Sequence, residues 1–498
     1  MPDNDRVVAI MLSSPLTESF ELTIARALDL KRIGTPLLVL YCNGTMKGCA
    51  ANPFKLSNIC AHCRIVRDAA LEENLPEVEA LALDAFVPAG DQRSILMDRL
   101  QSCKKAISDG AASTIKTFYR VESGAMQDKS GLCQYLFSAM ARNFEVYSEY
   151  IYICISNFLL VRDVIRLEFF NGRIVPTRAL MVAAVQQSID FTVIEVSGYG
   201  QPIFLSRNHE VHDLGYLKRR LRNYLDGGDF DVVLGGKFFY NRRNGAATDT
   251  RSFLQWQKSG CCNYPKDREI IAIFLSSPDE FDVMGDQWFT LGSKEPAEFI
   301  IELRKLLSEN YRIVVRMHPN QDGDRTGKTR LIIDRLGNIG QINLIRPRDP
   351  QSTYELIDNS RYILTFGSTV GLEATYWGKV SMLAGRAIWE DADVSFSVNT
   401  PADVVKLIES NPVPHSRKRA AMVGSYLMDK KDDSASLSWG DGGKYGFFAN
   451  GKSYLPLKRK SFAYWISRAL DRLMRIKMIC GGSKLDFAHF KRRSRGFP

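Results

Sequence analysis

The sequence predicts an α/β protein built from two similar halves, and two observations support this prediction. A short run rich in β-branched residues is followed by Ser-Ser-Pro at residues 7–15, and the same layout returns at 270–278. Apolar runs of strand length also alternate with stretches of helical periodicity, which is typical of parallel sheets. We therefore expect two Rossmann-like domains facing each other across a cleft, each with its first-strand loop at that cleft.

The chain length and one composition change suggest where the domains divide. A chain of 498 residues has room for two or three domains with large cores. The Gly- and Asp-rich run at 226–235 is the best boundary candidate. We expect an N-terminal domain over 1–230, a linker helix over 231–267, a second domain over 268–415 and a tail over 416–498.

In the first half, β-branched and aromatic runs bounded by turn residues predict strands, and longer periodic stretches predict helices. The apolar stretch Tyr150–Val161 is too short to span a membrane and is closed by Arg162 and Asp163, so we expect a buried helix there. The expected strands are 6–12, 36–41, 167–170 and 191–196; the expected helices are 18–31, 68–115, 131–166, 176–188 and 214–225.

In the second half, the stretch Arg361–Gly385 predicts a complete β-turn-α-β unit. A strand over 362–366 is broken by Gly367, and Ser368 or Thr369 is expected to cap a helix that stops at Gly378. Further strands are expected at 270–275, 312–317, 342–345 and 380–383. The free N–H groups and the dipole at such a helix start favour an anion such as phosphate.

Polar residues follow three of these expected strands, where parallel strands would bring them to one edge of the sheet. The candidate donor-phosphate contacts are Ser276, Ser277, Arg316, His318, Ser368 and Thr369. Glu373 lies one helical turn beyond Thr369 and would accept from ribose hydroxyls or shape the site. The alternative is that these are ordinary turns, because every α/β protein contains several strand-turn-helix units.

The first half offers candidates for the opposite side of the cleft. The strand over 167–170 ends in Asn171-Gly172-Arg173, and Glu195 lies near the end of the following strand. An arginine fork suits phosphate or carboxylate, and a carboxylate suits a general base. Asn171 and Arg173 would therefore bind at the acceptor side of the cleft, with Glu195 as base. The alternatives are a helix-entry turn with a surface arginine and a structural carboxylate pair.

Four cysteines, Cys42, Cys49, Cys60 and Cys63, form a C-x6-C-x10-C-x2-C cluster. Four thiols ending in a CxxC pair fit a tetrahedral structural zinc site, although the first spacing is unusual. Ordinary buried thiols and redox chemistry remain open alternatives. A closed four-thiolate site would hold a loop in place and would not catalyse, so we expect no cofactor to be required for the reaction.

The net charge of +10 is a property of the C-terminal tail. Residues 458–498 contain twelve Lys and Arg against two Asp, so the rest of the chain is close to neutral. A basic amphipathic helix over 462–478 would bind an anionic membrane surface or dock on the N-terminal domain. Nucleic-acid binding is disfavoured because no binding module accompanies the charge. Without a signal peptide, we expect a cytoplasmic protein, peripheral on the inner membrane face if the tail binds there.

Three segments carry a family resemblance: RMHPN, LIDNSRYILTFGSTVGLEATYWGK and FFNGR. They resemble the capsule-polysaccharide biosynthesis glycosyltransferases of GT-B architecture, which include Kdo transferases, sialyltransferases and polyol-phosphate transferases. The resemblance is close over 268–411 and looser over 1–200. It implies metal-independent transfer of a sugar from a nucleotide-sugar donor, leaning towards a CMP-linked one, to a surface or capsular glycan or lipid-linked acceptor. His318 and Glu195 would be the catalytic residues.

Other functions fit the same sequence. The second half also resembles the non-hydrolysing UDP-N-acetylglucosamine 2-epimerases, which would form product without any acceptor. A polyol-phosphate transferase would use the same donor edge. A non-catalytic scaffold, with the cysteine cluster and basic tail as its working parts, would leave the cleft indifferent to nucleotides.

Overall fold

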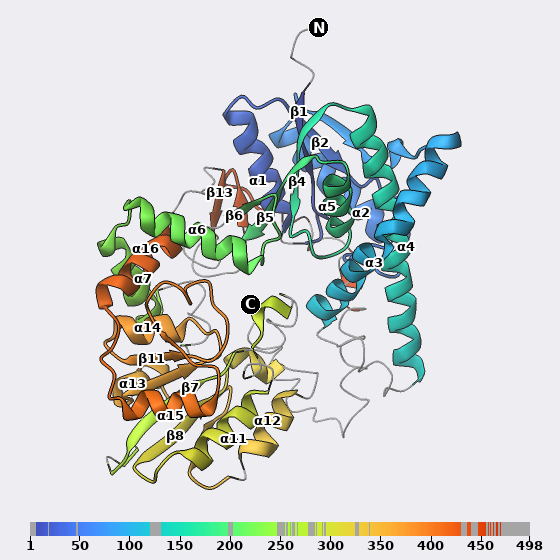
Figure 1. Cartoon of the computed structure of the whole chain (residues 1–498). Helices are drawn as coiled ribbons and strands as arrows, with labels where there is room; N and C mark the ends of the chain where they lie inside the picture. Colours follow the sequence, from blue (N-terminus) through green and yellow to red (C-terminus); the bar gives the residue numbers. More distant parts are fainter. Residues whose placement is uncertain are drawn as a thin grey trace.

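A computed structural model gives the arrangement of most of the chain (Figure 1). It contains two α/β units, one above the other in Figure 1, each built on a six-stranded sheet. The residues it describes are 6–17, 19–45, 48–119, 131–197, 203–246, 254, 257, 258, 260, 264, 265, 267–276, 284, 286–290, 292, 295–323, 328–337, 339–429, 436–439, 447–454, 457, 459, 462, 465, 466 and 469.

The first sheet has the strand order β3-β2-β1-β4-β5-β6. All neighbouring strands are parallel except β5 and β6, which are antiparallel. The strands are β1 Val7–Met11, β2 Leu37–Tyr41, β3 Glu79–Ala82, β4 Val164–Phe170, β5 Asp190–Val196 and β6 Ile203–Arg207. The expected helix over 68–115 is wrong in part, because β3 interrupts it. This edge strand is only four residues long, too short for an alternating pattern to show.

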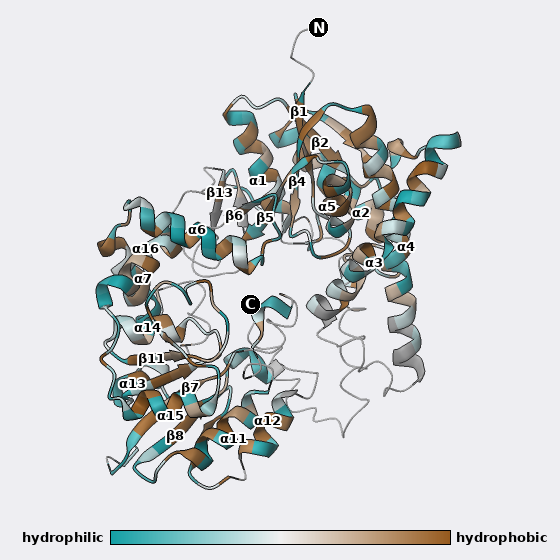
Figure 2. Ribbon diagram, viewed as in Figure 1, coloured by the Kyte–Doolittle hydropathy of each residue, from teal (hydrophilic) through white to brown (hydrophobic). Residues whose placement is uncertain are grey.

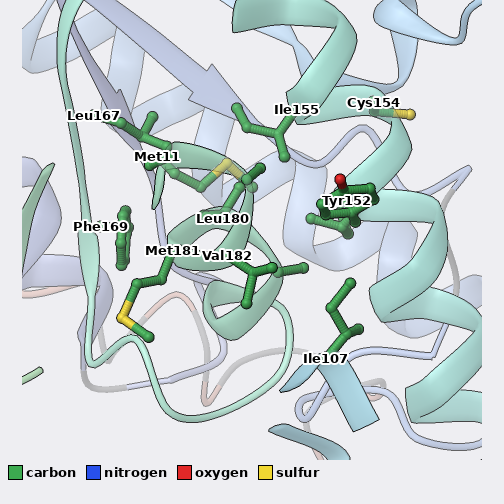
Figure 3. Close-up of a cluster of buried hydrophobic side chains, with 14 of the residues drawn as sticks. Met11, Ile107, Tyr152, Cys154, Ile155, Leu167, Phe169, Leu180, Met181 and Val182 are labelled. Atoms are coloured by element: carbon green, nitrogen blue, oxygen red, sulfur yellow. The ribbon is translucent and has the colours of Figure 1, made fainter. Parts of the chain in front are cut away.

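Helices cover both faces of this sheet. They are α1 Ser19–Arg32, α2 Ser57–Asn74, the 3-10 turn η2 Leu83–Phe86, α3 Gly90–Tyr119, α4 Gly131–Val161 and α5 Thr177–Gln186. Figure 3 shows one core, in which Met11, Leu167 and Phe169 from the sheet meet side chains of α3, α4 and α5. The other face is covered by α1 and α2. Burial of the strands between two helical layers explains their continuous apolar runs.

The long helix α4 is a core helix, as the sequence predicts. Among the described residues, its segment Ser138–Val161 is the only helix long and apolar enough to cross a membrane, and 67% of that segment is buried inside the protein. It ends at Val161, earlier than expected, because β4 begins at Val164.

The second sheet repeats the first topology, with the order β12-β11-β10-β7-β8-β9 and all strands parallel. Its strands are β7 Glu269–Phe274, β8 Tyr311–Arg316, β9 Ile342–Ile345, β10 Tyr362–Thr365, β11 Val380–Leu383 and β12 Phe396–Ser397. Its helices include α11 Pro296–Leu306, α12 Lys328–Leu336, α13 Thr353–Asn359, α14 Val370–Tyr376 and α15 Pro401–Glu409, with 3-10 turns η4 Asp286–Trp288 and η5 Pro319–Gly323.

Both sheets therefore follow the doubly wound order in which the first and fourth strands are neighbours. This order places a topological switch point beside β1 in the first unit and beside β7 in the second, where ligands bind in such sheets. Figure 2 shows the hydrophobic colour concentrated on the strands and on the helix faces turned towards them. The predicted fold class, two Rossmann-like α/β domains, is confirmed.

Three helices connect the units: α6 Leu214–Gly227, α7 Val232–Arg243 and α16 Arg417–Met428. They pack together with α14 in one apolar cluster of the second unit. A Cβ atom at Gly235 would lie 1.8 Å from the Ala421 carbonyl oxygen, so α7 and α16 cross in backbone contact. The Tyr224 hydroxyl also lies 2.7 Å from Ser425 Oγ. Within the expected linker over 231–267, α7 occupies only the first third.

After α16 the chain returns to the first unit. Strands β13 Leu437–Trp439 and β14 Phe447–Ala449 form an antiparallel hairpin. Tyr454, just beyond this hairpin, is fully buried in the cluster formed with α1 and α2. Most of the basic tail 458–498, including most of the amphipathic helix expected over 462–478, lies outside the described residues. Of those described, Phe462 and Trp465 are exposed.

Candidate active site

Three strands of the second sheet bring the predicted donor residues to one edge. Phe274 at the end of β7 is in register with Thr365 of β10 and with Arg316 of β8. Ser276, Gly367 and His318 each lie two residues beyond this level. Ser276 Oγ donates to the Phe366 carbonyl at 3.3 Å, which joins the loops after β7 and β10 directly. Ser277 lies outside the described residues.

The turn between β10 and α14 has the local form that the sequence predicts, with one difference in its cap. Gly367 has φ +110°, a conformation that side chains strongly disfavour. Ser368 Oγ accepts from the Val370 N–H at 3.3 Å. Thr369 occupies the cap position itself with helical dihedral angles and makes no side-chain cap bond. The helix ends before Gly378, which has φ +76° as its expected stop signal requires.

Thr369 is held instead by a buried ionic network. Arg242 of α7 donates through Nη2 to Thr369 Oγ1 and through Nε to Glu373 Oε1, both at 3.0 Å. The Tyr354 hydroxyl donates to Glu373 Oε2 at 2.5 Å. Glu373 is 2% exposed and Arg242 is 7% exposed. Both carboxylate oxygens of Glu373 are thus engaged, and Arg242 links Glu373 to Thr369.

Arg242 and Tyr354 were missed by the sequence reasoning. Arg242 is one of two consecutive arginines in the last turn of α7 and follows no motif, so no local signal marks it. The predicted phosphate contact Arg316 is also buried, at 3% exposure, and its Nη1 donates to the Gln351 carbonyl at 2.6 Å. In this position the Arg316 side chain is better placed to hold the segment before α13 than to contact a ligand directly.

His318 follows β8 and is half-buried. Its backbone N–H donates to Gln321 Oε1 at 2.7 Å, and its Nδ1 accepts from the Asn320 N–H at 3.2 Å. An Nδ1 that accepts this bond carries no proton in the neutral ring, so the proton resides on Nε2. His318 can thus donate a hydrogen bond through Nε2 while remaining neutral.

The first unit gathers Asn171, Arg173 and Glu195 at the end of β4. Asn171 has φ +65° and Gly172 φ +71°, so the Asn-Gly pair supplies two successive left-handed residues that turn the chain. Asn171 Nδ2 donates to Glu195 Oε2 at 2.5 Å, and its Oδ1 accepts from the Arg173 N–H at 3.1 Å. The three predicted residues therefore form one hydrogen-bonded group.

Burial shifts the pKa values of two members of this group. It raises the pKa of Glu195 above the ordinary value of 4.5, against hydrogen bonds from the Val196 N–H and Asn171 and the charge of Arg173. Burial also lowers the pKa of the Arg173 guanidinium, which the charges of Glu195 and Glu210 oppose. A carboxylate with a raised pKa is a stronger base, which suits proton abstraction from a hydroxyl.

The two units are in contact at His212. Trp288 Nε1 of the second unit donates to the His212 carbonyl at 2.7 Å, and Gln287 Nε2 donates to the same oxygen at 3.0 Å. Burial and the charge of Arg173 lower the pKa of His212 from 6.5 to about 3, so its ring is neutral at physiological pH. The 3-10 turn η4 of the second unit is thus hydrogen-bonded to a histidine that lies near Arg173 of the first unit. The His212 side chain is half-buried.

The four cysteines of the predicted metal cluster are free thiols near β2 and the start of α2. Within the described residues, no group of three or more His, Cys, Asp or Glu side chains is already spaced to hold a metal ion.

Comparisons with known proteins give structural likenesses only. No protein-family model matches the chain, and no curated protein matches it. Among solved structures it is similar to the KpsC β-Kdo 2,4-transferase of Thermosulfurimonas dismutans, at 12% identity and TM-score 0.36, over 53% of this chain and 79% of that one. The β-Kdo 2,7-transferase of the same organism has 14% identity and TM-score 0.34, over 62% and 90%.

The UDP-GlcNAc 2-epimerase of Neisseria meningitidis, solved with UDP-GlcNAc, is also similar, at 14% identity and TM-score 0.29, over 85% of this chain and 96% of that one. Such low scores decide nothing about activity. The class defined here, a protein of two facing doubly wound domains, rests on the strand order of the two sheets.

Proposed function

We propose that the protein is a glycosyltransferase that moves a sugar from a nucleotide-sugar donor to a glycan or lipid-linked acceptor. The observation that supports this proposal most is that the two units, which are in contact at His212, carry groups of different chemistry in the loops after their strands. The second unit offers neutral hydrogen-bond donors after β7, β8 and β10. The first offers a carboxylate of raised pKa beside an amide and an arginine. A two-substrate transfer needs both sets.

On the donor side, His318 Nε2 and the Ser368 hydroxyl would bind the phosphate, with Ser276 and Thr369 holding the loops in place. Negative charge grows on the leaving phosphate as the glycosidic bond breaks. Donors fixed in advance stabilise that charge without reorganising. Thr369 is fixed by Arg242, so its position depends on the buried network with Glu373. In this proposal Ser277 remains a candidate phosphate contact.

On the acceptor side, Glu195 would remove the proton from the attacking hydroxyl. Asn171 holds one carboxylate oxygen and the Val196 N–H holds the other, so the base is oriented before substrate binds. Arg173 would bind an anionic group of the acceptor or of the donor sugar. General-base assistance of this kind contributes about 10²–10⁴-fold to the rate.

The finer identity of the substrates is also part of the proposal. We favour a CMP-linked donor sugar and a surface or capsular glycan as acceptor, with the reaction taking place in the cytoplasm. The basic tail 458–498 would attach the enzyme to the anionic inner face of the membrane, where lipid-linked acceptors reside.

The first test is a thermal-shift panel of CMP, CDP, UMP, UDP and GDP on the full chain and on His318→Ala. A ligand that binds only the folded state at about 100 times its Kd adds about 2.7 kcal/mol of stability. We expect one nucleotide to raise the Tm of the wild type and not of His318→Ala. His415→Ala, a histidine of the same unit bonded to Asp393, is the matched control and should keep the shift.

Absence of a shift with every nucleotide would contradict the donor site and favour a non-catalytic scaffold. A UDP-selective shift would lead to a second assay. Conversion of UDP-GlcNAc without any acceptor would identify an epimerase, whereas strict dependence on an acceptor glycan would support transfer.

A further inference from the structure

Four cysteine thiols lie together in the first unit, apart from the proposed reaction. Cys42 follows β2, Cys49 lies in the next loop, and Cys60 and Cys63 lie in the first turns of α2. The Cys49 thiol is within electrostatic range of the other three. Since Cys42 and Cys63 are 21 positions apart, the fold of the loop, and not sequence proximity, assembles the group.

Gly44, in the loop after Cys42, lies close against Cys60 of α2. Gly44 has φ +84°, and a Cβ atom there would lie 3.0 Å from the Cβ of Cys60. A side chain at this position would therefore be strained by its backbone and would crowd Cys60. The backbone thus comes as close to α2 as glycine allows.

Hydrogen-bonding groups lie beside Cys42, Cys60 and Cys63. The Gly44 N–H donates to Cys42 Sγ at 3.4 Å, and Asn52 Nδ2 donates to Cys60 Sγ at 3.1 Å. The Ser14 hydroxyl lies 3.4 Å from Cys63 Sγ, within hydrogen-bonding distance. A neutral thiol is a weak acceptor, whereas metal-bound thiolates are regularly stabilised by such donors. The N–H donors at Cys42 and Cys60 would therefore suit thiolates bound to a metal.

A cation lies at the same place. The Arg67 guanidinium is 6% exposed, and its Nη1 donates to the Cys42 carbonyl at 2.9 Å. Zn²⁺ with four thiolates carries a net charge of −2, so a buried cation beside it would offset part of that charge. Asp68 shares this arginine at 2.5 Å and reduces the effect without removing it.

We propose that Cys42, Cys49, Cys60 and Cys63 bind one Zn²⁺ in a tetrahedral four-thiolate site that is structural. Each thiol gives up its proton to solvent as its sulfur bonds to the metal. Because the sulfurs are not yet at ligand spacing, binding would draw them together.

Zinc binding would also restrain the loop after β1, which lies at the switch point of the first unit. Ser14 Oγ lies 3.4 Å from Cys63 Sγ, and the Tyr147 hydroxyl of α4 hydrogen-bonds Cys42. Zinc would thereby tie the loop after β1 to the loop after β2 and to α4. It would hold the edge of the sheet beside Asn171 without touching a substrate. This inference does not depend on the proposed transferase activity.

The test is the zinc content of the full chain, purified without added metal and measured by inductively coupled plasma mass spectrometry. We expect about one Zn²⁺ per chain. Cys60→Ser and Cys63→Ser should lose most of it. Cys103→Ser and Cys154→Ser are matched controls, because both cysteines are buried in the same unit outside the cluster, and they should keep the metal. Equal loss in all four variants, or equal retention, would overturn the proposal.

A second measurement does not rely on the variants folding. Apo wild type titrated with Co²⁺ should develop intense tetrahedral d–d bands and thiolate-to-cobalt charge transfer, saturating at about one equivalent, and Zn²⁺ should abolish both. Weak octahedral bands would mean adventitious metal only. A Cys60–Cys63 disulfide in freshly purified protein, found by differential alkylation, would favour redox chemistry and overturn the zinc site.

Discussion

Replacement of Glu373 by alanine tests the buried network that holds the proposed donor loop. The carboxylate bonds Arg242 at 3.0 Å and Tyr354 at 2.5 Å, and it is 2% exposed. Removing it leaves a buried guanidinium that keeps its hydrogen bond to Thr369 but has lost its carboxylate partner. Breaking a buried ion pair on one side costs about 3–5 kcal/mol, because the remaining charge is not compensated. We expect Glu373→Ala to destabilise the second unit by that amount.

A double-mutant cycle separates the interaction between Glu373 and Arg242 from destabilisation that either substitution causes by itself. Arg242→Ala alone should also destabilise the unit, and the double variant should cost less than the sum of the two. Contacting residues in one network show coupling of about 0.5–3 kcal/mol. Glu298→Ala is the matched control, because its ion pair with Arg335 is exposed on both sides. It should cost about 0–1 kcal/mol.

The assay has to report on the second unit alone, because a chain of two units need not unfold in one transition. Native-state hydrogen exchange of peptides covering 362–376 measures the local opening free energy of β10 and α14. If Glu373→Ala lowers that free energy by no more than Glu298→Ala does, the network does not hold the loop and our reasoning on Thr369 fails. Thermal shifts with nucleotides in the Glu373→Ala variant then show whether nucleotide binding depends on this network.

Three further predictions concern single features. The pKa of His212 is lowered from 6.5 to about 3, so the unfolded state binds a proton at this residue before the folded state does as the pH falls. The free energy of unfolding should therefore decline between pH 6.5 and about pH 3. His212→Gln should flatten this decline when unfolding is measured by urea titration at each pH. Gly367→Ala should cost about 1–3 kcal/mol by calorimetry, because φ there is +110°, and a cost near zero would mean that the turn is not strained. Deleting 458–498 should release the protein from anionic vesicles in co-sedimentation, and unchanged binding would refute a membrane role for the tail.

Much of the fold was predictable because its signals are local. The β-branched runs of β1, β7 and β10 and the Ser-Ser-Pro echo identified two similar sheets. Asn171-Gly172 and Gly367 mark turns because their left-handed backbone excludes most other residues. Short β3 escaped prediction, since four residues at a sheet edge need no apolar alternation.

The candidate site was predictable only in part, since loop position follows from strand order but side-chain partners do not. His318, Ser276 and the Gly367 turn meet at one edge because β8, β7 and β10 are neighbours. The ion pair of Glu373 could not be predicted, because its partner Arg242 lies 131 positions away in the sequence and carries no motif.

By itself, the sequence determined the two doubly wound units and the turns at their strand ends, because periodicity and turn chemistry act over a few residues. Tertiary structure decided which polar groups are buried against one another. It also decided the partial burial of His212 beside Trp288, the placing of Cys42 and Cys60 beside Gly44, and the return of the chain to the first unit at Tyr454. These depend on contacts between distant segments, and their free energy comes from burial and pairing that no local pattern records.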